Sequence, residues 1–226
     1  MLRNEFKNLI ETALKKNILF YTPLATTEHV MVYRVTMTDE SIYVAKFANE
    51  NLKIEAFMLD YLRDKARMPT PKVMYAADHL LIMEYVQTSW HLDRQAERDA
   101  ARLLAQCHNV TSDLFGFEQD TVIGGLRQPN TQNSSWLDFF IKERLFYMGS
   151  HAMSERKLEG RIFDKLEKLA AKMGNLLPNT ATPSLIHGDA WVGNILAGQG
   201  EINAFVDPAL YYADPEIEIA FTTLFH

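Results

Sequence analysis

HGDAWVGN occupies residues 187–194, and after a short predicted hairpin the chain reads FVD at residues 205–207. Asn194 follows Asp189 by five residues, and Asp207 follows Asn194 by thirteen. Asn and Asp side chains offer hard oxygen donors, which Mg²⁺ prefers when it binds beside phosphates. A separate carboxylate can orient an attacking hydroxyl and accept its proton. The stretch therefore predicts phosphoryl transfer, with Asp189 as the base and Asn194 and Asp207 as metal ligands.

The same order of residues is typical of kinases, which place an Asp, an Asn five residues later and a second Asp after the next strand pair. The alternative is a simple turn, because Asp, Asn and Gly favour turns. His187 is expected to brace the loop, with a role as general base as the second interpretation.

A second pattern lies upstream, where YVAKF at residues 43–47 predicts a strand. Lys46 and Val44 share one face of that strand because side chains alternate. Glu55 follows nine residues after Lys46, on a predicted helix. A strand lysine paired with a helix glutamate holds the α- and β-phosphates in kinases. The alternative for Lys46 or Glu55 taken alone is an ordinary charged side chain in solvent. Lys53 and Glu50 are the other candidates for the roles of the lysine and the glutamate.

A third pattern is the apolar run LLIMEYV at residues 80–86, which predicts a buried strand that enters a connector. The backbone of Glu84 and Val86 could bond an adenine edge, with Met83 behind the base; a plain core strand is the alternative. The segment LATTEH at residues 24–29 is expected to be the loop between the first strands, and it contains no glycine. Backbone amides of Thr26 and Thr27 could still reach phosphate, although Glu28 brings a like charge.

The order of predicted elements indicates α+β architecture in two lobes. Residues 1–86 form the first lobe, with a helix near the N-terminus, strands and the helix of Glu55. Residues 87–226 form a mostly helical second lobe that carries the catalytic loop and the metal site. The predicted strands cover residues 30–37, 42–47, 73–76 and 80–86. Two further helices are predicted to begin at residues 52 and 96, and three more are predicted at residues 136–148, 162–173 and 215–225.

Composition excludes several classes of protein. The 226 residues carry 23 Lys and Arg against 29 Asp and Glu, a net charge of −6 that argues against nucleic acid as a partner. A single cysteine, Cys107, excludes a disulfide framework and a multi-thiolate metal site. No apolar run approaches the roughly 20 residues that span a bilayer. We expect a cytoplasmic protein with no membrane partner.

Together these motifs resemble the aminoglycoside phosphotransferase superfamily of protein-kinase-like enzymes. Three stretches are similar to the fructosamine/ketosamine-3-kinase family: LFGF at 114–117 with WLDFF at 136–140, the loop at 187–194, and VDPALYY at 206–212. The resemblance implies a bilobal protein-kinase-like fold with a small antiparallel sheet. It also implies phosphorylation, with ATP and Mg²⁺, of the 3-hydroxyl of a ketose attached to an amine.

The resemblance also implies site roles. Asp189 becomes the base, Asn194 and Asp207 the magnesium ligands, and Lys46 with Glu55 the phosphate clamp. Trp191 becomes a platform for the sugar, or a core tryptophan beside a tight turn.

The chain departs from the family near its end. Pro215 and Glu218 stand where the family usually has Arg and Asp, and the chain stops at His226, where relatives typically continue. The acidic residues Asp214, Glu216 and Glu218 would suit a cationic amine.

The expected substrate is a sugar–amine adduct, free or protein-bound, and the expected state is a monomer or weak homodimer. Two rivals remain: a kinase of another alcohol, such as an aminoglycoside or amino sugar, and a non-catalytic nucleotide-binding pseudokinase.

Overall fold

The computed structural model of the chain describes residues 4–89, 92–177 and 180–224. The chain forms two compact units, each described by itself. The first unit comprises Met1–Leu103 and Val192–Pro208, and the second comprises Leu104–Trp191 and Ala209–His226. Residues 192–208 thus group with the first unit, whereas the sequence predicts one boundary near residue 86; that boundary stays a prediction.

The first unit is built on a five-stranded antiparallel sheet in the order β1-β2-β3-β5-β4. Its strands and helices are α1 (Asn4–Leu14), β1 (Ile18–Thr26), β2 (Val30–Met37), β3 (Ile42–Ala48), α2 (Leu52–Ala66), β4 (Val73–Ala77), β5 (Leu80–Glu84), the start of α3 (Arg94–His108), β9 (Ile195–Gly198) and β10 (Glu201–Phe205).

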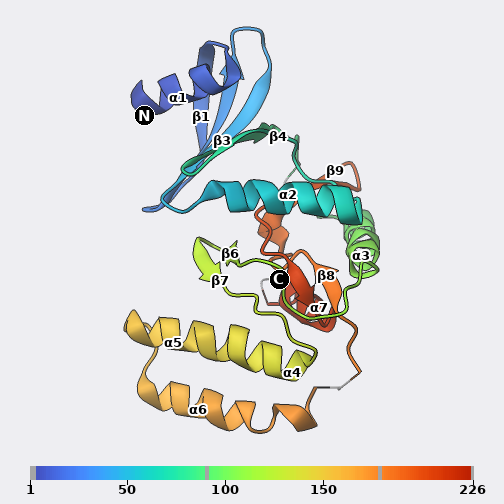
Figure 1. Ribbon diagram of the computed structural model, residues 1–226. Helices are drawn as coiled ribbons and strands as arrows, with labels where there is room; N and C mark the ends of the chain where they lie inside the picture. The colour runs from blue at the N-terminus through green and yellow to red at the C-terminus, as the bar shows by residue number, and fades with distance from the viewer. Residues whose placement is uncertain (1–3, 90–91, 178–179, 225–226) are drawn as a thin grey trace. The chain divides into compact units, whose positions relative to one another are not determined.

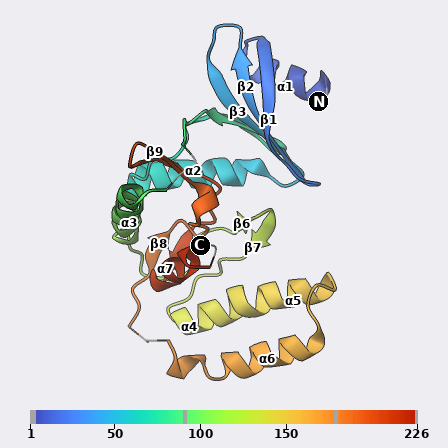
Figure 2. The same ribbon diagram turned by 180° about the vertical axis from the view of Figure 1, so that it is seen from behind.

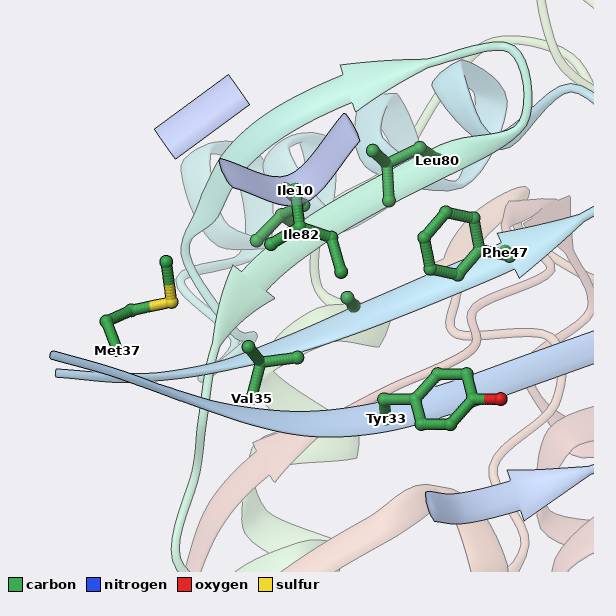
Figure 3. Close-up of a cluster of buried hydrophobic side chains, with 8 residues drawn as sticks. Ile10, Tyr33, Val35, Met37, Phe47, Leu80 and Ile82 are labelled. Atoms are coloured by element: carbon green, nitrogen blue, oxygen red, sulfur yellow. The ribbon is translucent and has the colours of Figure 1, made fainter. Parts of the chain in front are cut away.

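Alternation along the strands gives the sheet two apolar faces, each covered by a helix. Ile10 of α1 packs on one face, where Val35, Phe47 and Ile82 point toward it (Figure 3). On the other face, Leu52 and Leu59 of α2 pack against strand residues of β3 and β5. The side chains at Val44 and Lys46 belong to this second face, because they alternate with the buried Ala45 and Phe47.

The helix α2 begins at a polar cap, where the side chain of Asn51 accepts from the amide of Lys53 at 3.0 Å. Such caps satisfy one of the free amides of a helix start. The β9–β10 hairpin is tied to the segment that follows β5: the amide of Ser89 donates to the carbonyl of Ala197 at 2.8 Å, and the side chain of Asn203 donates to the carbonyl of Gln87 at 2.7 Å. These bonds bring the hairpin into the first unit.

The second unit is mostly helical and carries, among the described residues, two short strand pairs and isolated bridges. Its elements are the end of α3, β6 (Thr121–Ile123), β7 (Leu126–Gln128), α4 (Trp136–Phe139), a π-helical stretch (Phe140–Phe146), α5 (Tyr147–Ser154), α6 (Gly160–Ala170), β8 (Ser184–Ile186), β11 (Tyr211–Ala213) and α7 (Glu216–Thr222). The helices α5 and α6 lie side by side (Figures 1 and 2), with the rings of Phe146 and Phe163 6.1 Å apart.

The predicted α+β class is confirmed, and the predicted strand at residues 30–37 matches β2. The strand β1 extends through residues 24–26, which the sequence indicates as loop. Pro23 is tolerated there because β1 lies at an edge of the sheet, where a missing amide donor breaks no central ladder. The closing helix ends at Thr222, and predicted helix residue 225 lies outside the described residues. None of the helices that the structure describes is long and apolar enough to cross a membrane.

Candidate functional site

The centre of the first unit is a lysine held by two carboxylates. Lys46 Nζ lies 2.7 Å from Glu55 Oε2 and 2.8 Å from Asp207 Oδ1. The strand β3 presents Lys46 and the first turn of α2 presents Glu55, so the predicted pair is in contact. The side chain of Asp207 is 51% exposed, in contrast to the buried Lys46 and Glu55. A ligand can therefore reach the carboxylate of Asp207.

Lys46 and its two carboxylate neighbours shift one another's pKa values. Burial opposes the charge on Lys46, but the carboxylates of Glu55 and Asp207 outweigh burial and raise the pKa of Lys46 above its ordinary value. Burial also raises the pKa of Glu55 to about 8, while the ammonium of Lys46 acts in the opposite direction. Lys46 is thus a fixed cation at the base of the site, which suits the binding of phosphate.

Asn194 and Asp207 lie at one end of the β9–β10 hairpin. The last register pair of the hairpin joins Ile195 to Phe205, and the amide of Val206 donates to the carbonyl of Asn194 at 3.0 Å. Asp207 follows directly and has a φ of 51°, a left-handed conformation that is strained for a residue other than glycine. The hairpin therefore brings the two predicted metal ligands close together.

Asn194 and Asp207 fit a magnesium ion by their chemistry, because both offer oxygen donors. In the described portion of the chain, no three His, Cys, Asp or Glu side chains are grouped to hold a metal ion. Mg²⁺ at nucleotide sites is bound by one or two protein side chains together with phosphates. The residues present thus suit an ion that arrives with the nucleotide.

A cavity of about 250 Å³ opens beside Lys46 within the first unit. Several predicted residues line the cavity: Val44, Lys46, Met83, Glu84, Val86 and Asp207. Across residues 4–89, 92–177 and 180–224, no protein group accepts a hydrogen bond from the amide of Val86. The amide of Glu84 donates to the carbonyl of Lys72 at 2.9 Å instead. Val86 therefore offers a donor to a base in this cavity.

The turn between β1 and β2 does not place Thr26 and Thr27 where the sequence predicts a phosphate contact. Thr26 and Thr27 do not line this cavity, whereas Leu24 and Ala25 do. The amide of Thr27 donates to the carbonyl of Val30 at 2.8 Å, and its hydroxyl accepts from the amide of Val30 at 3.0 Å. The amide of Thr27 is thus committed to the hairpin turn, and the predicted phosphate contact of Thr26 and Thr27 gains no support from the geometry.

Asp189 lies in the second unit, on the loop that follows β8. Gly188 adopts a φ of 85°, and a Cβ added there would lie 2.0 Å from the carbonyl oxygen of Ala209. A side chain at residue 188 would therefore displace the backbone at residue 209. The amide of Asp189 donates to Nδ1 of His187 at 3.3 Å, and His187 is fully buried. This placement fits a bracing role for His187.

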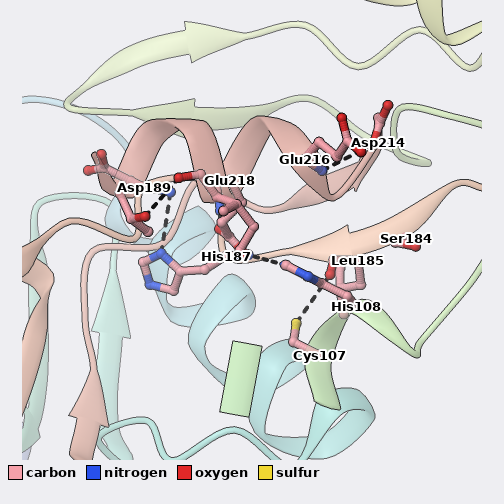
Figure 4. A network of polar contacts seen from close by, with 12 residues as sticks. Cys107, His108, Ser184, Leu185, His187, Asp189, Asp214, Glu216 and Glu218 are labelled. Carbon is pink, nitrogen blue, oxygen red and sulfur yellow. Dashed lines mark hydrogen bonds and ion pairs between the residues drawn. The ribbon is translucent and has the colours of Figure 1, made fainter. Parts of the chain in front are cut away.

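Glu218 of α7 holds the loop through hydrogen bonds to its backbone (Figure 4). Its carboxylate accepts from the amide of Gly188 at 2.7 Å and from the amide of His187 at 3.3 Å. Nε2 of His108 lies 2.8 Å from the same carboxylate. Glu218 is 2% exposed, so the expectation that it helps to bind a cationic amine is wrong. A buried carboxylate needs this many donors to offset its desolvation.

Cys107 lies beside this network and has no reactive character. It is fully buried, and its thiol donates to the carbonyl of Leu185 at 3.3 Å. Burial, together with the charge of Glu218, raises the pKa of the Cys107 thiol well above its ordinary value. The cysteine acts as a packed core residue.

The other two acidic candidates lie close to aromatic rings. Asp214 and Glu216 line a cavity of about 180 Å³ together with Trp136 and Phe140. Asp214 is 5% exposed, and its carboxylate accepts from the amide of Glu216 at 3.0 Å. Asp214 therefore also stabilises the start of α7. Trp191, the predicted sugar platform, is half-buried and does not line this cavity.

Sequence reasoning missed two residues of the second unit, Glu218 as the support of the loop and His108 as its neighbour. One signal for Glu218 was available: it stands between Ile217 and Ile219 on a predicted helix, three residues before Phe221. The partner of Glu218 could not be found in this way, because 110 positions separate it from His108.

Comparison with known proteins agrees with this geometry. Residues 5–226 match the family model for fructosamine kinase. The protein-ribulosamine 3-kinase of Arabidopsis thaliana chloroplasts is 34% identical over 187 residues, which are 80% of this chain and 56% of that protein. The chain spans about half the length of the curated relatives it matches.

Solved structures share the fold. A Thermobifida fusca protein that carries the fructosamine-3-kinase name superposes with a TM-score of 0.87 at 24% identity, over 99% of this chain and 80% of that one. An aminoglycoside phosphotransferase, solved with streptomycin and ATP, superposes with a TM-score of 0.63 at 18% identity, over 96% of this chain and 74% of that one. The predicted kinase-like fold is thus confirmed. Because the family model covers nearly the whole sequence, the chain belongs to the fructosamine kinase family.

Proposed function

We propose that the chain phosphorylates a hydroxyl of a ketosamine, a sugar–amine adduct of the fructosamine or ribulosamine type, with ATP as the donor. The observation that carries this proposal is the contact of Lys46 with both Glu55 and Asp207 beside a cavity of about 250 Å³. Family membership and the ribulosamine kinase named above support the substrate class.

In this proposal the first unit binds the nucleotide. The amide of Val86 donates to the base, with Val44 and Met83 on its apolar sides and Glu84 at the edge of the cavity. Lys46, held in place by Glu55, binds phosphate oxygens. Asn194 and Asp207 hold Mg²⁺, which when bound neutralises charge that develops on the phosphates.

The second unit supplies the base. Asp189 orients the sugar hydroxyl and accepts its proton as the oxygen attacks the γ-phosphorus. Glu218 keeps the backbone of residues 187–188 fixed, so that Asp189 is positioned before the substrate arrives. Trp191, Asp214 and Glu216 are the proposed contacts for the sugar and its amine. A cationic amine suits the two carboxylates and the neighbouring aromatic rings.

The proposed setting is the cytoplasm, where a reduced and buried Cys107 is expected. The proposed state is a monomer or weak homodimer.

A substrate screen by mass spectrometry tests the proposal. Ribulosamine and fructosamine adducts of free lysine, and the same adducts on a glycated protein, are each incubated with MgATP. We expect a phosphorylated ketosamine and an equal amount of ADP, and neither product with Asp189→Asn. Phosphorylation of an aminoglycoside but of no ketosamine would contradict the substrate class, and binding of MgATP without any phosphorylated product would indicate a pseudokinase.

A further inference from the structure

A larger cavity, of about 1150 Å³, lies in the first unit on the face of the sheet that α1 covers. Its walls come from residues 5–13 of α1, from the β1–β2 turn at residues 27–29, and from the β4–β5 turn at residues 78–79. It shares no lining residue with the cavity beside Lys46. The proposed function leaves this space unused.

The walls combine carboxylates with aromatic and apolar surface. Glu5, Glu28 and Asp78 line the cavity together with His29 and His79, and none of the lysines or arginines in the described ranges lines it. Asp78 pairs with Lys53 at 2.8 Å, whereas Glu5 and Glu28 form no ion pair with any residue that the structure describes. Among the described residues, these two carboxylates therefore carry negative charge without a cationic partner.

The apolar part of the cavity is formed by rings. Phe6 of α1 stacks on Phe47 of β3 with ring centroids 4.3 Å apart, and both line the cavity. Tyr75 of β4 also lines it and is 39% exposed. An organic cation is attracted both to carboxylates and to exposed ring faces. The chemistry of the walls favours a ligand that carries positive charge next to apolar groups.

Two of the walls belong to elements that also build the nucleotide site. The β1–β2 turn continues from Leu24 and Ala25, which line the cavity beside Lys46. The carbonyl of Asp78 accepts from the amide of Leu52 at 2.8 Å, so the β4–β5 turn holds the first residue of α2. Glu55 follows three residues later on the same helix. The walls of the larger cavity are thus continuous with elements that position groups around Lys46.

We propose that this cavity binds a basic peptide segment of a partner protein, and that its occupancy changes the affinity for MgATP. Lysine or arginine side chains of the segment lie against Glu5 and Glu28, and its apolar side chains contact Phe6 and Tyr75. A peptide is the chosen occupant because the volume exceeds the ~300–1,000 Å³ typical of small-molecule pockets. The binding part is independent of the proposed catalytic function, and the coupling part rests on its nucleotide site.

Isothermal titration with a defined probe tests the binding. The probe is the acetylated peptide amide Arg-Phe-Arg-Phe, compared with Glu-Phe-Glu-Phe. We expect the basic probe alone to bind, and its dissociation constant to rise with salt because exposed charges are screened. The double variant Glu5→Gln, Glu28→Gln should weaken binding about tenfold, since each exposed ion pair contributes less than about 1 kcal/mol.

The matched control is Glu97→Gln, Glu167→Gln, which makes the same charge change at exposed helix positions outside the cavity. Equal weakening in both double variants would show that only net charge matters and would overturn the site. A second variant, Tyr75→Ala, should weaken the basic probe without a change of charge. Unchanged binding in both Tyr75→Ala and the Glu5 and Glu28 variant would also overturn it.

The coupling has its own readout. The dissociation constant of MgATP is measured with and without saturating probe, and that of the probe with and without MgATP. Reciprocity requires the two ratios to agree. A ratio of one in both directions would overturn the coupling but leave the peptide site standing. If the protein phosphorylates no ketosamine when no probe is present, that result contradicts the proposed function and leaves the peptide site standing.

Discussion

Asp189 and Lys46 carry most of the proposed chemistry at the level of single residues. The sequence predicts both positions, because Asp189 stands at a fixed spacing from Asn194 on a short loop and Lys46 stands in an alternating strand. The contacts of Lys46 with Glu55 and Asp207 confirm that distant residues meet within the first unit. The role of Asp189 stays a prediction, and it can be tested directly.

Asp189→Asn removes the proposed base with little change in shape. We expect turnover to fall by about 10²–10⁴-fold, the usual contribution of a general base. The affinity for MgATP should be unchanged, because Asp189 belongs to the second unit and the nucleotide cavity to the first. Steady-state turnover and equilibrium nucleotide titration measure the two effects. Turnover at the rate of the unaltered protein would remove Asp189 from the mechanism.

Lys46→Met removes the buried cation and leaves Glu55 and Asp207 without their shared partner. A hydrogen bond to a charged group contributes about 1.5–3 kcal/mol, so MgATP should bind roughly ten- to a hundredfold more weakly. Lys53→Met is the matched control, since Lys53 is an exposed lysine on α2 that pairs only with Asp78 among the described residues. A nucleotide affinity that is equal in both variants would contradict the proposed clamp.

The elements divide into those that a local pattern predicts and those that it does not. The strand β2 and the helix α2 follow from alternation and from helical periodicity together with the cap at Asn51. The strand β1 escapes prediction because Pro23 argues against a strand, and only the position at the sheet edge makes it tolerable. The π-helical stretch at residues 140–146 escapes as well, since its periodicity differs little from that of an α-helix over seven residues.

The helix α7 acts mainly through Glu218, and its contribution is measurable. Glu218→Gln keeps the size of the side chain but loses the charge that two backbone amides and His108 face. We expect the free energy of unfolding to fall by about 1–3 kcal/mol, the cost of leaving buried polar partners poorly satisfied. Turnover should fall at the same time, with little change in nucleotide affinity.

Chemical denaturation of this variant is compared with that of Glu167→Gln, which alters an exposed residue of α6 in the same unit. Equal stability in the two variants would show that Glu218 does not support the loop.

At the scale of the whole molecule, the chain returns to its first unit after an excursion of nearly ninety residues. Residues 192–208 complete the group around Lys46, although 161 positions separate Lys46 from Asp207. No local pattern predicts this contact, which the structure shows.

Ligand binding should therefore be visible in the stability of the protein. A ligand at a hundred times its dissociation constant stabilises the folded state by about 2.7 kcal/mol. We expect MgATP to raise the midpoint of thermal unfolding by several degrees, and Mg²⁺ alone to have little effect, since two protein side chains bind Mg²⁺ well only together with phosphates. Differential scanning calorimetry measures both. An equal rise with Mg²⁺ alone would indicate a separate metal site and contradict this account.

Phosphorus NMR of a ketosamine incubated with MgATP tests the central claim most directly. The account predicts a new phosphomonoester signal on the 3-hydroxyl of the ribulosamine or fructosamine, formed with an equal amount of ADP and absent with Asp189→Asn. Unchanged ATP signals with no new phosphomonoester signal, in a sample shown by calorimetry to bind MgATP, would contradict it.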